Sequence, residues 1–140
     1  MFVIIMGCGR VGARLALMMT HANHEVTIMD IKSSAFSRLG SDFKGSTILG
    51  NGIDQEVLRR AGIERADAFV AATQGDNRNI MASQIAKHVF GVKRVVTRVY
   101  DPLRSDTFAA LGLQAISPTI IGANSFYEEL TGESAPKLPV

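Results

Sequence analysis

Along this chain, short uninterrupted apolar runs alternate with longer stretches in which apolar residues recur at helical spacing. The run Phe2–Met6 contains no polar residue, which is typical of a strand buried on both faces of a parallel sheet. In Arg10–His21 the apolar residues return every three or four positions, which predicts a helix. The same alternation continues along the chain and predicts five more strands, at Glu25–Asp30, Ser46–Leu49, 68–73, 94–100 and 114–117.

Turn and capping residues set the expected limits of the segments between these strands. Asp54 and Asp76 each stand at the start of a helical pattern, and an aspartate there caps a helix by accepting hydrogen bonds from the free amides of its first turn. The expected helices cover residues 33–39, 54–61, 76–90, 102–112 and 118–131. Six strands with helices between them predict a single-domain α/β fold: a Rossmann-like, doubly wound, parallel six-stranded sheet with helices on both faces.

Composition narrows the class of protein. With 140 residues, of which 46% are hydrophobic and 20% charged, the chain fits one folded domain and not a disordered segment. A net charge of +2 is too small for a protein that binds nucleic acid by charge alone, so no nucleic-acid partner is expected. The single cysteine, Cys8, excludes an internal disulfide and a zinc site built from several cysteines. No apolar run approaches the roughly 18 residues that span a bilayer, and a cytoplasmic location is expected.

The most informative motif is GCGRVG, which stands between the first predicted strand and the first predicted helix and has the pattern G-x-G-x-x-G. Gly7 permits a tight turn, Gly9 lets the backbone approach a phosphate, and Gly12 lets the helix pack closely on the sheet. The free amides and the positive dipole end of the helix then attract phosphate. This context predicts a nucleotide-binding loop.

Two charged side chains extend the prediction. Asp30 closes the second predicted strand, near the roughly 20 residues after the loop at which a ribose-binding carboxylate is expected. Its charge disfavours a 2′-phosphate, and therefore NADP. Arg10 stands at the start of the helix, where a cation opposes the helix dipole unless phosphate lies nearby. We interpret Arg10 as a phosphate contact and Arg14, one turn later, as a second candidate; the alternative is that they point into solvent.

Other strand ends are expected to line the same crevice, because ligands of open α/β sheets bind outside the carboxyl ends of the strands. This rule nominates residues on both sides of the crevice: Asn51 and Asp54 on the adenine side, and Thr73, Asp76 and Asn79 on the opposite side. Capping alone explains Asp54 and Asp76, and Asn51 could equally serve its own turn.

Arg98 is a single charge within an otherwise apolar stretch, VVTRVY, and either points to the crevice or pairs with an acidic residue. The sequence contains no Ser/His/Asp arrangement, HExxH motif or Walker loop, so no catalytic and no metal-binding residue is predicted. The complete predicted nucleotide site consists of Gly7, Cys8, Gly9, Arg10, Val11, Gly12, Asp30, Ile31, Lys32, Asn51, Gly52, Ile53, Thr73, Asn79 and Arg98.

Taken together, these motifs resemble a known family. The pieces are GCGRVG, Asp30, GNGIDQEVLRRAGIERAD, ATQGDNRNI, VVTRVYDPLR and the stretch 116–118. They are similar to the N-terminal domain of regulators of potassium conductance, also called RCK, KTN or TrkA-N, over residues 1–132. The arginine after the second glycine and the DPxR sequence are more specific than the glycine pattern alone.

The resemblance implies a cytosolic gating module of a potassium channel or uptake system, which binds ATP, ADP, AMP, NAD or NADH without turning it over. It assigns phosphate binding to the glycine loop and Arg10, and ribose binding to Asp30. It places Asn51 beside the adenine, and Thr73 and Asn79 on the opposite side of the crevice. The implied partner is a membrane potassium transporter or channel subunit, which would hold the module at the inner face of the membrane.

The resemblance also implies an assembly. Family members dimerise through the last helix and form larger rings. The helix 118–131 has apolar residues around more of its circumference than one sheet face covers, so it packs on a partner chain or, alternatively, covers the sheet edge. Many members carry a second, smaller domain, whereas here only the tail 133–140 follows. A free-standing module, a module that works with a separate partner chain, and a truncated form all fit this arrangement.

Two alternative functions use the same predicted site. One is an NAD(H)-binding redox sensor, and the other is the cofactor domain of an NAD-dependent oxidoreductase. The residues do not separate them from the first reading, because Asp30 would bind a ribose that all these nucleotides share.

Overall fold

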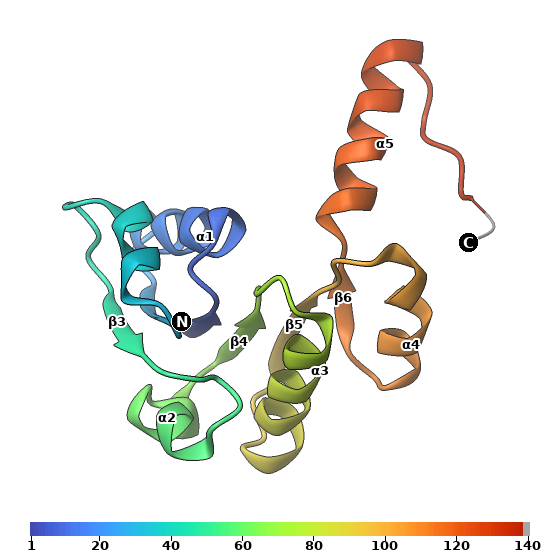
Figure 1. The fold of residues 1–140 in the computed structure, drawn as a ribbon. Coiled ribbons are helices and arrows are strands. Elements are labelled where there is room, and N and C mark those ends of the chain that lie inside the picture. The colour runs from blue at the N-terminus through green and yellow to red at the C-terminus, as the bar shows by residue number, and fades with distance from the viewer. Residues whose placement is uncertain (139–140) are drawn as a thin grey trace.

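The apolar runs assemble into one sheet (Figure 1). In the computed structural model, which describes residues 1–138, six parallel strands follow the order β3-β2-β1-β4-β5-β6. Strand β1 pairs with both β2 and β4, and all of its residues are buried, as its apolar sequence predicts. The predicted α/β class is confirmed. The strands span Phe2–Met6 (β1), Glu25–Asp30 (β2), Ser46–Leu49 (β3), Ala68–Ala71 (β4), Arg94–Arg98 (β5) and Gln114–Ile116 (β6).

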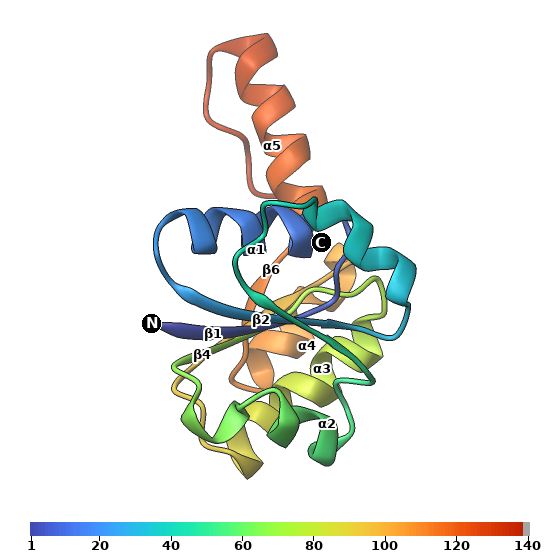
Figure 2. The same cartoon turned by 90° about the vertical axis from the view of Figure 1, so that its left-hand side faces the viewer.

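Helices cover both faces of the sheet. Helix α1 and a 3-10 turn at Ser33–Leu39 lie on one face, and α2, α3 and α4 lie on the other (Figure 2). Helix α3 continues into a π-helical turn at Ile85–Val89, and shorter 3-10 turns occupy Ile63–Arg65 and Pro102–Arg104. The α-helices of the described residues span Arg10–His21 (α1), Gln55–Arg60 (α2), Asp76–Gln84 (α3), Ser105–Ala110 (α4) and Pro118–Thr131 (α5).

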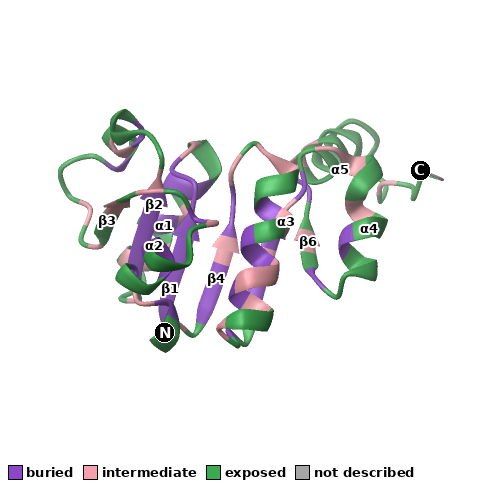
Figure 3. Cartoon of the chain, turned by 60° about the horizontal axis from the view of Figure 1, so that its bottom comes forward, coloured by how far each residue is buried: buried purple, intermediate pink, exposed green. Residues whose placement is uncertain are grey.

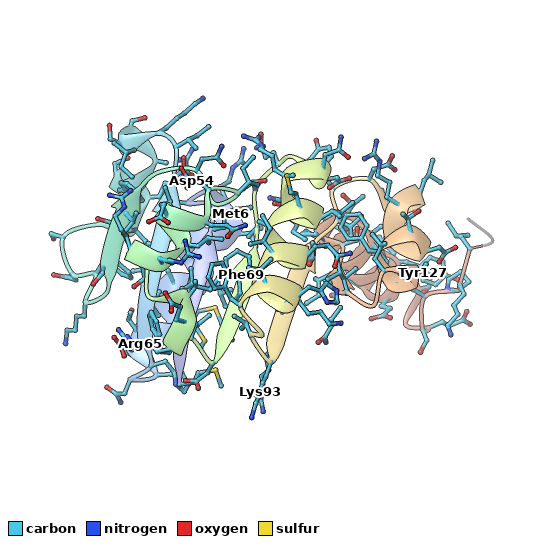
Figure 4. All side chains as sticks on the ribbon, turned by 90° about the horizontal axis from the view of Figure 1, so that it is seen from below. Met6, Asp54, Arg65, Phe69, Lys93 and Tyr127 are labelled. Atoms are coloured by element: carbon cyan, nitrogen blue, oxygen red, sulfur yellow. The ribbon has the colours of Figure 1, made fainter. Side chains whose placement is uncertain are left out.

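Each face of the sheet has its own apolar core, because successive side chains of a strand point to opposite faces. Ile4, Met6 and Phe69 pack under α2 and α3, and Figure 4 shows Met6 and Phe69 in this layer. Val3 and Ile5 pack on the opposite face, against α1 and the 3-10 turn. The two cores fix the sheet between its helices and leave the carboxyl ends of the strands at one edge.

Some predicted boundaries are too long. Strands β4, β5 and β6 end before the predicted limits of 73, 100 and 117, because the following backbone turns away to bond with loops and helix starts. The N–H of Thr73 donates to Oδ1 of Asn79 (3.1 Å), and the N–H of Tyr100 donates to Oδ1 of Asp76 (2.6 Å). The amides of Thr73 and Tyr100, just after β4 and β5, thus donate to side chains of α3 and do not continue the hydrogen bonds of the sheet.

The two predicted helix caps have different outcomes. Asp54 is confirmed as an N-cap, since its Oδ1 accepts the N–H of Glu56 (2.9 Å). The prediction for Asp76 is wrong: Gly75 occupies the N-cap position, and Asp76 is the first residue of α3. Its carboxylate accepts the backbone N–H groups of Tyr100 and Asp101 and so joins α3 to the end of β5.

Helix α5 differs from the rest of the fold. It projects away from the sheet (Figure 1), and none of its residues is buried (Figure 3). Phe126 and Leu130 are 74% and 85% exposed. The expected alternative in which this helix covers the sheet edge is not the arrangement that the chain adopts.

The predicted boundary between the domain and its tail lies near the C-terminal end of the chain. The division into a domain of residues 1–132 and a tail of residues 133–140 stays a prediction, and residues 139–140 lie outside the described part. Within residues 1–138, none of the helices combines the length and the apolar character needed to cross a bilayer.

Candidate functional site

The candidate site lies where the chain reverses its direction across the sheet. From β1 the chain proceeds to β2 and β3 on one side, and β4, β5 and β6 extend the sheet on the other side. The loops after β1 and β4 therefore diverge and leave a crevice between them, which is where open α/β sheets bind ligands.

Backbone geometry explains two glycines of the loop. Gly7 has a φ of +106°, and a Cβ there would lie 2.9 Å from the backbone of Ala72 and Thr73. A Cβ on Gly12 would collide with the carbonyl oxygen of Gly7, so only glycine lets α1 begin this close to the loop. Both glycines are therefore required by the fold itself.

Gly9 is different, because the fold gives no steric reason for it. No atom lies within 4 Å of the position that its Cβ would occupy, and its φ of −82° suits any residue. It stands at the N-cap of α1 without a side-chain cap, next to first-turn amides that have no acceptor within the helix. The open space beside Gly9 is available to a ligand that approaches these amides.

Asp30 holds the loop in place. Its Oδ2 accepts the N–H of Cys8 (2.8 Å), and its Oδ1 accepts the N–H of Lys32 (2.9 Å). A carboxylate has about four acceptor sites, so capacity is left for ribose hydroxyls. Asp30 therefore positions the loop in addition to its predicted role toward a ligand.

Cys8 connects the loop to the 3-10 turn over it. Its Sγ donates to the carbonyl of Ala35 (3.4 Å), and its own carbonyl has a long contact with Nη1 of Arg38 (3.5 Å). Burial raises the pKa of the Cys8 thiol, Asp30 acts in the same direction, and Arg38 opposes both. The neutral thiol is the favoured form, which is the opposite of what a reactive cysteine needs.

Asn79 fixes the far side of the crevice from within the protein. It is fully buried, and its Oδ1 accepts the N–H (3.1 Å) and Oγ1–H (2.6 Å) of Thr73. Its Nδ2 donates to the carbonyls of Thr73 (2.9 Å) and Arg98 (3.1 Å). Asn79 thus positions two predicted site residues and joins the end of β4 to the end of β5.

A pocket of about 550 Å³, which we call the loop pocket, lies over the glycine loop. Its predicted members come from the loop, from the end of β2 and from the strands across the crevice. They are Gly7, Cys8, Gly9, Arg10, Val11, Asp30, Ile31, Lys32, Thr73 and Arg98.

Five predicted residues do not line this pocket: Gly12, Asn51, Gly52, Ile53 and Asn79. Gly12 and Asn79 lie behind it, in the packing described above. Asn51 closes its own turn, because its Oδ1 accepts the N–H of Ile53 (3.2 Å). Gly52 is buried, and a Cβ there would collide with Met6. The turn after β3 is thus explained by local packing, and its contact with a ligand stays a prediction.

The loop pocket also contains side chains that the sequence analysis did not single out: Ala35, Arg38, Ala72, Gln74, Arg78 and Tyr100. The sequence contains a signal for Gln74 and Arg78, because they follow β4 within the ATQGDNRNI motif. It contains no local signal for Arg38, because this residue reaches the loop pocket only when the 3-10 turn folds back over the glycine loop. No group of three His, Cys, Asp or Glu side chains in residues 1–138 is placed to hold a metal ion.

An apolar groove of about 640 Å³ adjoins the loop pocket, between α1 and the outer strands. Met18 of α1 faces Val70, Val96 and Ile116 of β4, β5 and β6 across it. The residues lining the groove include Arg10, Arg14 and Arg98 but no acidic residue. We call this surface the apolar groove.

The strand order and the glycine loop at the crevice define a Rossmann-like domain of the nucleotide-binding type. The chain belongs to the TrkA-N domain family, whose sequence model matches residues 3–118. The resemblance drawn from the motifs is therefore confirmed.

One curated relative and two solved structures illustrate the likeness. The Trk system potassium uptake protein TrkA of Streptomyces coelicolor is 41% identical over 138 residues, which are 99% of this chain and 62% of that protein. The Kef CTD of Shewanella denitrificans in its AMP-bound form is 21% identical, over 94% of this chain and 80% of that chain, with a TM-score of 0.80. The GsuK channel bound to NAD is 25% identical, over 92% of this chain and 23% of that chain, also with a TM-score of 0.80. The chain spans 62%, 60% and 55% of the length of the first curated relatives it matches.

Proposed function

We propose that this chain is a nucleotide-binding regulatory module of a potassium uptake transporter or channel. In this proposal the loop pocket binds an adenine nucleotide (ATP, ADP or AMP) or NAD or NADH, and no chemical step follows. The name of the Streptomyces relative supports the transport role, and the AMP-bound and NAD-bound structures support the ligand class. The proposed location is cytoplasmic, at the inner face of the membrane through a membrane partner.

Gly9 carries the proposal. Gly7 and Gly12 are explained by packing, but the open position of Gly9 has no explanation within the chain. A phosphate seated against the first turn of α1 would occupy that space and accept the free amides.

The charge of the pocket favours several phosphates. Arg10, Lys32, Arg38, Arg78 and Arg98 line it, and Asp30 is its one acidic lining residue. That carboxylate already accepts two backbone amides. We therefore propose that ATP and ADP bind more tightly than AMP or NAD, since each added phosphate charge meets an arginine.

Titration calorimetry of the full chain against ATP, ADP, AMP, NAD, NADH and NADP tests the ligand class. We expect ATP and ADP to bind most tightly and NADP to bind least, because Asp30 repels a 2′-phosphate. A preference for NADH over ATP would favour the redox-sensor alternative. Binding of none of these nucleotides would overturn the proposed site.

Two variants that each add one methyl group test the role of Gly9. Gly9→Ala adds it in the open space of the pocket, and Ser46→Thr adds it at an exposed residue of β3 that lines neither the loop pocket nor the apolar groove. Both variants should unfold close to the parent. Gly9→Ala should bind ATP at least about tenfold more weakly, which corresponds to about 1.4 kcal/mol. Equal affinity in Gly9→Ala and Ser46→Thr would contradict the proposal.

The transport role is tested in cells. Gly9→Ala introduced into the chromosomal gene should alter the nucleotide response of potassium uptake, measured as rubidium influx while cellular ATP is depleted. Ser46→Thr should leave that response unchanged. Influx that follows ATP identically in both strains would remove the link between this pocket and transport.

We also propose that a second copy of the chain docks through α5. The helix exposes Ile121, Phe126 and Leu130, and Figure 1 shows that it projects away from the sheet of its own chain. Its charged residues, Glu128 and Glu129, are acidic, whereas the charged residues lining the apolar groove are arginines. A reciprocal exchange of α5 helices would cover both grooves in a two-fold dimer, and further contacts would build a larger ring.

Sedimentation equilibrium tests this dimer. Phe126→Asp should raise the dimer dissociation constant by at least about a hundredfold, because it places a charge in an apolar contact. Met81→Asp, at an exposed apolar residue of α3, is the matched control and should not change it. Equal effects of the two variants would exclude α5 as the contact.

A further inference from the structure

We propose that Arg98 couples the loop pocket to the apolar groove, so that a bound nucleotide strengthens docking of the second copy. This inference rests on the proposed function, which supplies a ligand for the pocket and an occupant for the groove. It concerns a property that neither site has alone: the two sites share a wall, and one half-buried charge, that of Arg98, lies in that wall.

The shared wall consists of Arg10, Val11, Ala72 and Arg98, which line both the loop pocket and the apolar groove. Arg10 is exposed on α1, so its charge can stay in water whichever site is filled. Arg98 is half-buried at the end of β5, between the two sites. Of the two arginines in the wall, Arg98 is the one that a docked helix would remove from water.

Arg98 has a donor that lacks an acceptor. Its Nε is buried, and no atom of residues 1–138 accepts a hydrogen bond from it. The guanidinium carbon lies 5.8 Å from the centre of the Tyr100 ring, which supplies a cation–π contact but no hydrogen bond. A buried donor of this kind is costly unless a ligand supplies the acceptor.

The backbone of Arg98 is anchored at the boundary between the two sites. Its carbonyl accepts a hydrogen bond from Nδ2 of the fully buried Asn79, which also donates to the carbonyl of Thr73 on the pocket side. The junction of β4 and β5 thus fixes the point from which the Arg98 side chain reaches the wall.

The direction of the coupling follows from charge burial. When α5 of a second copy covers the groove of an empty module, its two glutamates can pair with the exposed Arg10 and Arg14. The half-buried Arg98 charge then loses water without a partner, which opposes docking. When a nucleotide phosphate lies in the loop pocket, the same charge is paired before the groove closes. The desolvation of the Arg98 charge then opposes docking less. The nucleotide and the second copy should therefore each raise the affinity of the chain for the other by the same factor.

Variants of three arginines can distinguish this coupling from an effect on nucleotide binding alone or on docking alone. Arg98 lines both sites, Arg78 lines the loop pocket but not the groove, and Arg14 lines the groove but not the loop pocket. A change at Arg78 should weaken nucleotide binding alone, and a change at Arg14 should alter docking alone. Of these three arginines, only Arg98 should alter the dependence of docking on the nucleotide.

The experiment measures the dimer dissociation constant of the full chain by sedimentation, without nucleotide and with saturating ATP. For the parent we expect ATP to lower this constant on the order of tenfold. Arg98→Met replaces the charge with an apolar side chain of similar length. This variant should dimerise without nucleotide about as tightly as the parent does with ATP, and ATP should add little.

Control variants and the possible negative results separate failure of the coupling from failure of the proposed nucleotide site. Arg78→Gln and Arg14→Gln should keep the parent's ratio of dissociation constants at saturating ATP, and Arg98→Lys should keep part of it because the charge remains. A parent that binds ATP but dimerises equally with and without it, or never dimerises, overturns the coupling and leaves the nucleotide site standing. Failure to bind any nucleotide in calorimetry overturns the proposed function itself.

Discussion

The central strands and helix α5 are held by different means. Every residue of β1 is buried, and its partners in β4 lie far along the chain, as in the pairing of Val3 with Ala68. Helix α5 has no buried residue, and its ends are fixed locally. Oγ of Ser117 accepts the N–H of Ile120 (3.2 Å), and Gly132 ends the helix at a φ of +72°.

This difference separates two uses of apolar residues. In the centre, apolar side chains specify the sheet, because distant segments must meet to bury them. In α5 the helix is capped by its own flanking residues, and its apolar side chains stay exposed, which makes them available to the proposed docking of a second copy. Figure 4 shows the contrast between Phe69, which lies between the layers, and Tyr127, which lies on the projecting helix.

The largest expected effect comes from a matched pair of phenylalanines. Phe69→Ala empties a fully buried site and should lower the free energy of unfolding by about 3–5 kcal/mol. Phe126→Ala, at a side chain that is 74% exposed, should change it by less than about 0.5 kcal/mol in the monomer. Denaturant unfolding at low protein concentration measures both. Similar losses in the two variants would break the comparison.

A polar pair tests whether the centre depends on apolar burial alone. Asn79→Ala removes the partners of Thr73 and of the Arg98 carbonyl, and should cost about 2–3 kcal/mol because buried groups are left unsatisfied. Asn77→Ala removes only an exposed contact with Arg104 and should cost less than about 0.5 kcal/mol. Chemical denaturation compares them, and a mild effect of Asn79→Ala would mean that this junction adds little.

The local control of α5 is tested at its cap. Ser117→Ala should destabilise the helix by about 1 kcal/mol, since the cap is lost. Amide hydrogen exchange should accelerate in the first turns of α5, while the amides of β1 keep their protection. Thr119→Ala, in the same turn, serves as the control. Acceleration that spreads to β1 would show that the helix and the sheet unfold together.

The smallest expected effect is a pH dependence at Cys8. Because burial raises the pKa of this thiol above its ordinary value of 9.0, the folded chain holds the proton more firmly than the unfolded chain. Stability is therefore retained below pH 9 and decreases as the pH rises above it. Unfolding measured between about pH 8 and pH 10 should show a smaller decrease in Cys8→Ala. An identical decrease in that variant would assign the effect to other groups.

The sequence predicts the fold better than it predicts the site. Runs such as Phe2–Met6 and the glycine loop identify themselves within a few residues, because their signals are periodicity and turn geometry. Asp76 shows where such signals fail: it has the residue type of a cap, but its partners, Tyr100 and Asp101, lie more than twenty residues along the chain. Its role depends on where β5 ends.

The site residues divide in the same way. The motif and the strand end predict Gly7, Gly9 and Asp30 from the sequence, and all three line the loop pocket. Arg38 and Tyr100 reach the loop pocket only when separate segments fold over it, and no local pattern indicates that approach. The hydrogen bonds of Asn79 to Thr73 and to the carbonyl of Arg98 are revealed only by the packed structure, and its contact with a ligand stays a prediction.

The position of β1 also determines the order in which the domain can form. This strand is made before both of its neighbours, β2 on one side and β4 on the other. The N–H of Phe2 donates to Asp67 (2.7 Å), across a separation of 65 residues. During synthesis β1 therefore has one edge unpaired until the chain has been extended through β4. Because such distant pairing slows folding, exposure of that edge is the interval in which a nascent chain is most open to aggregation.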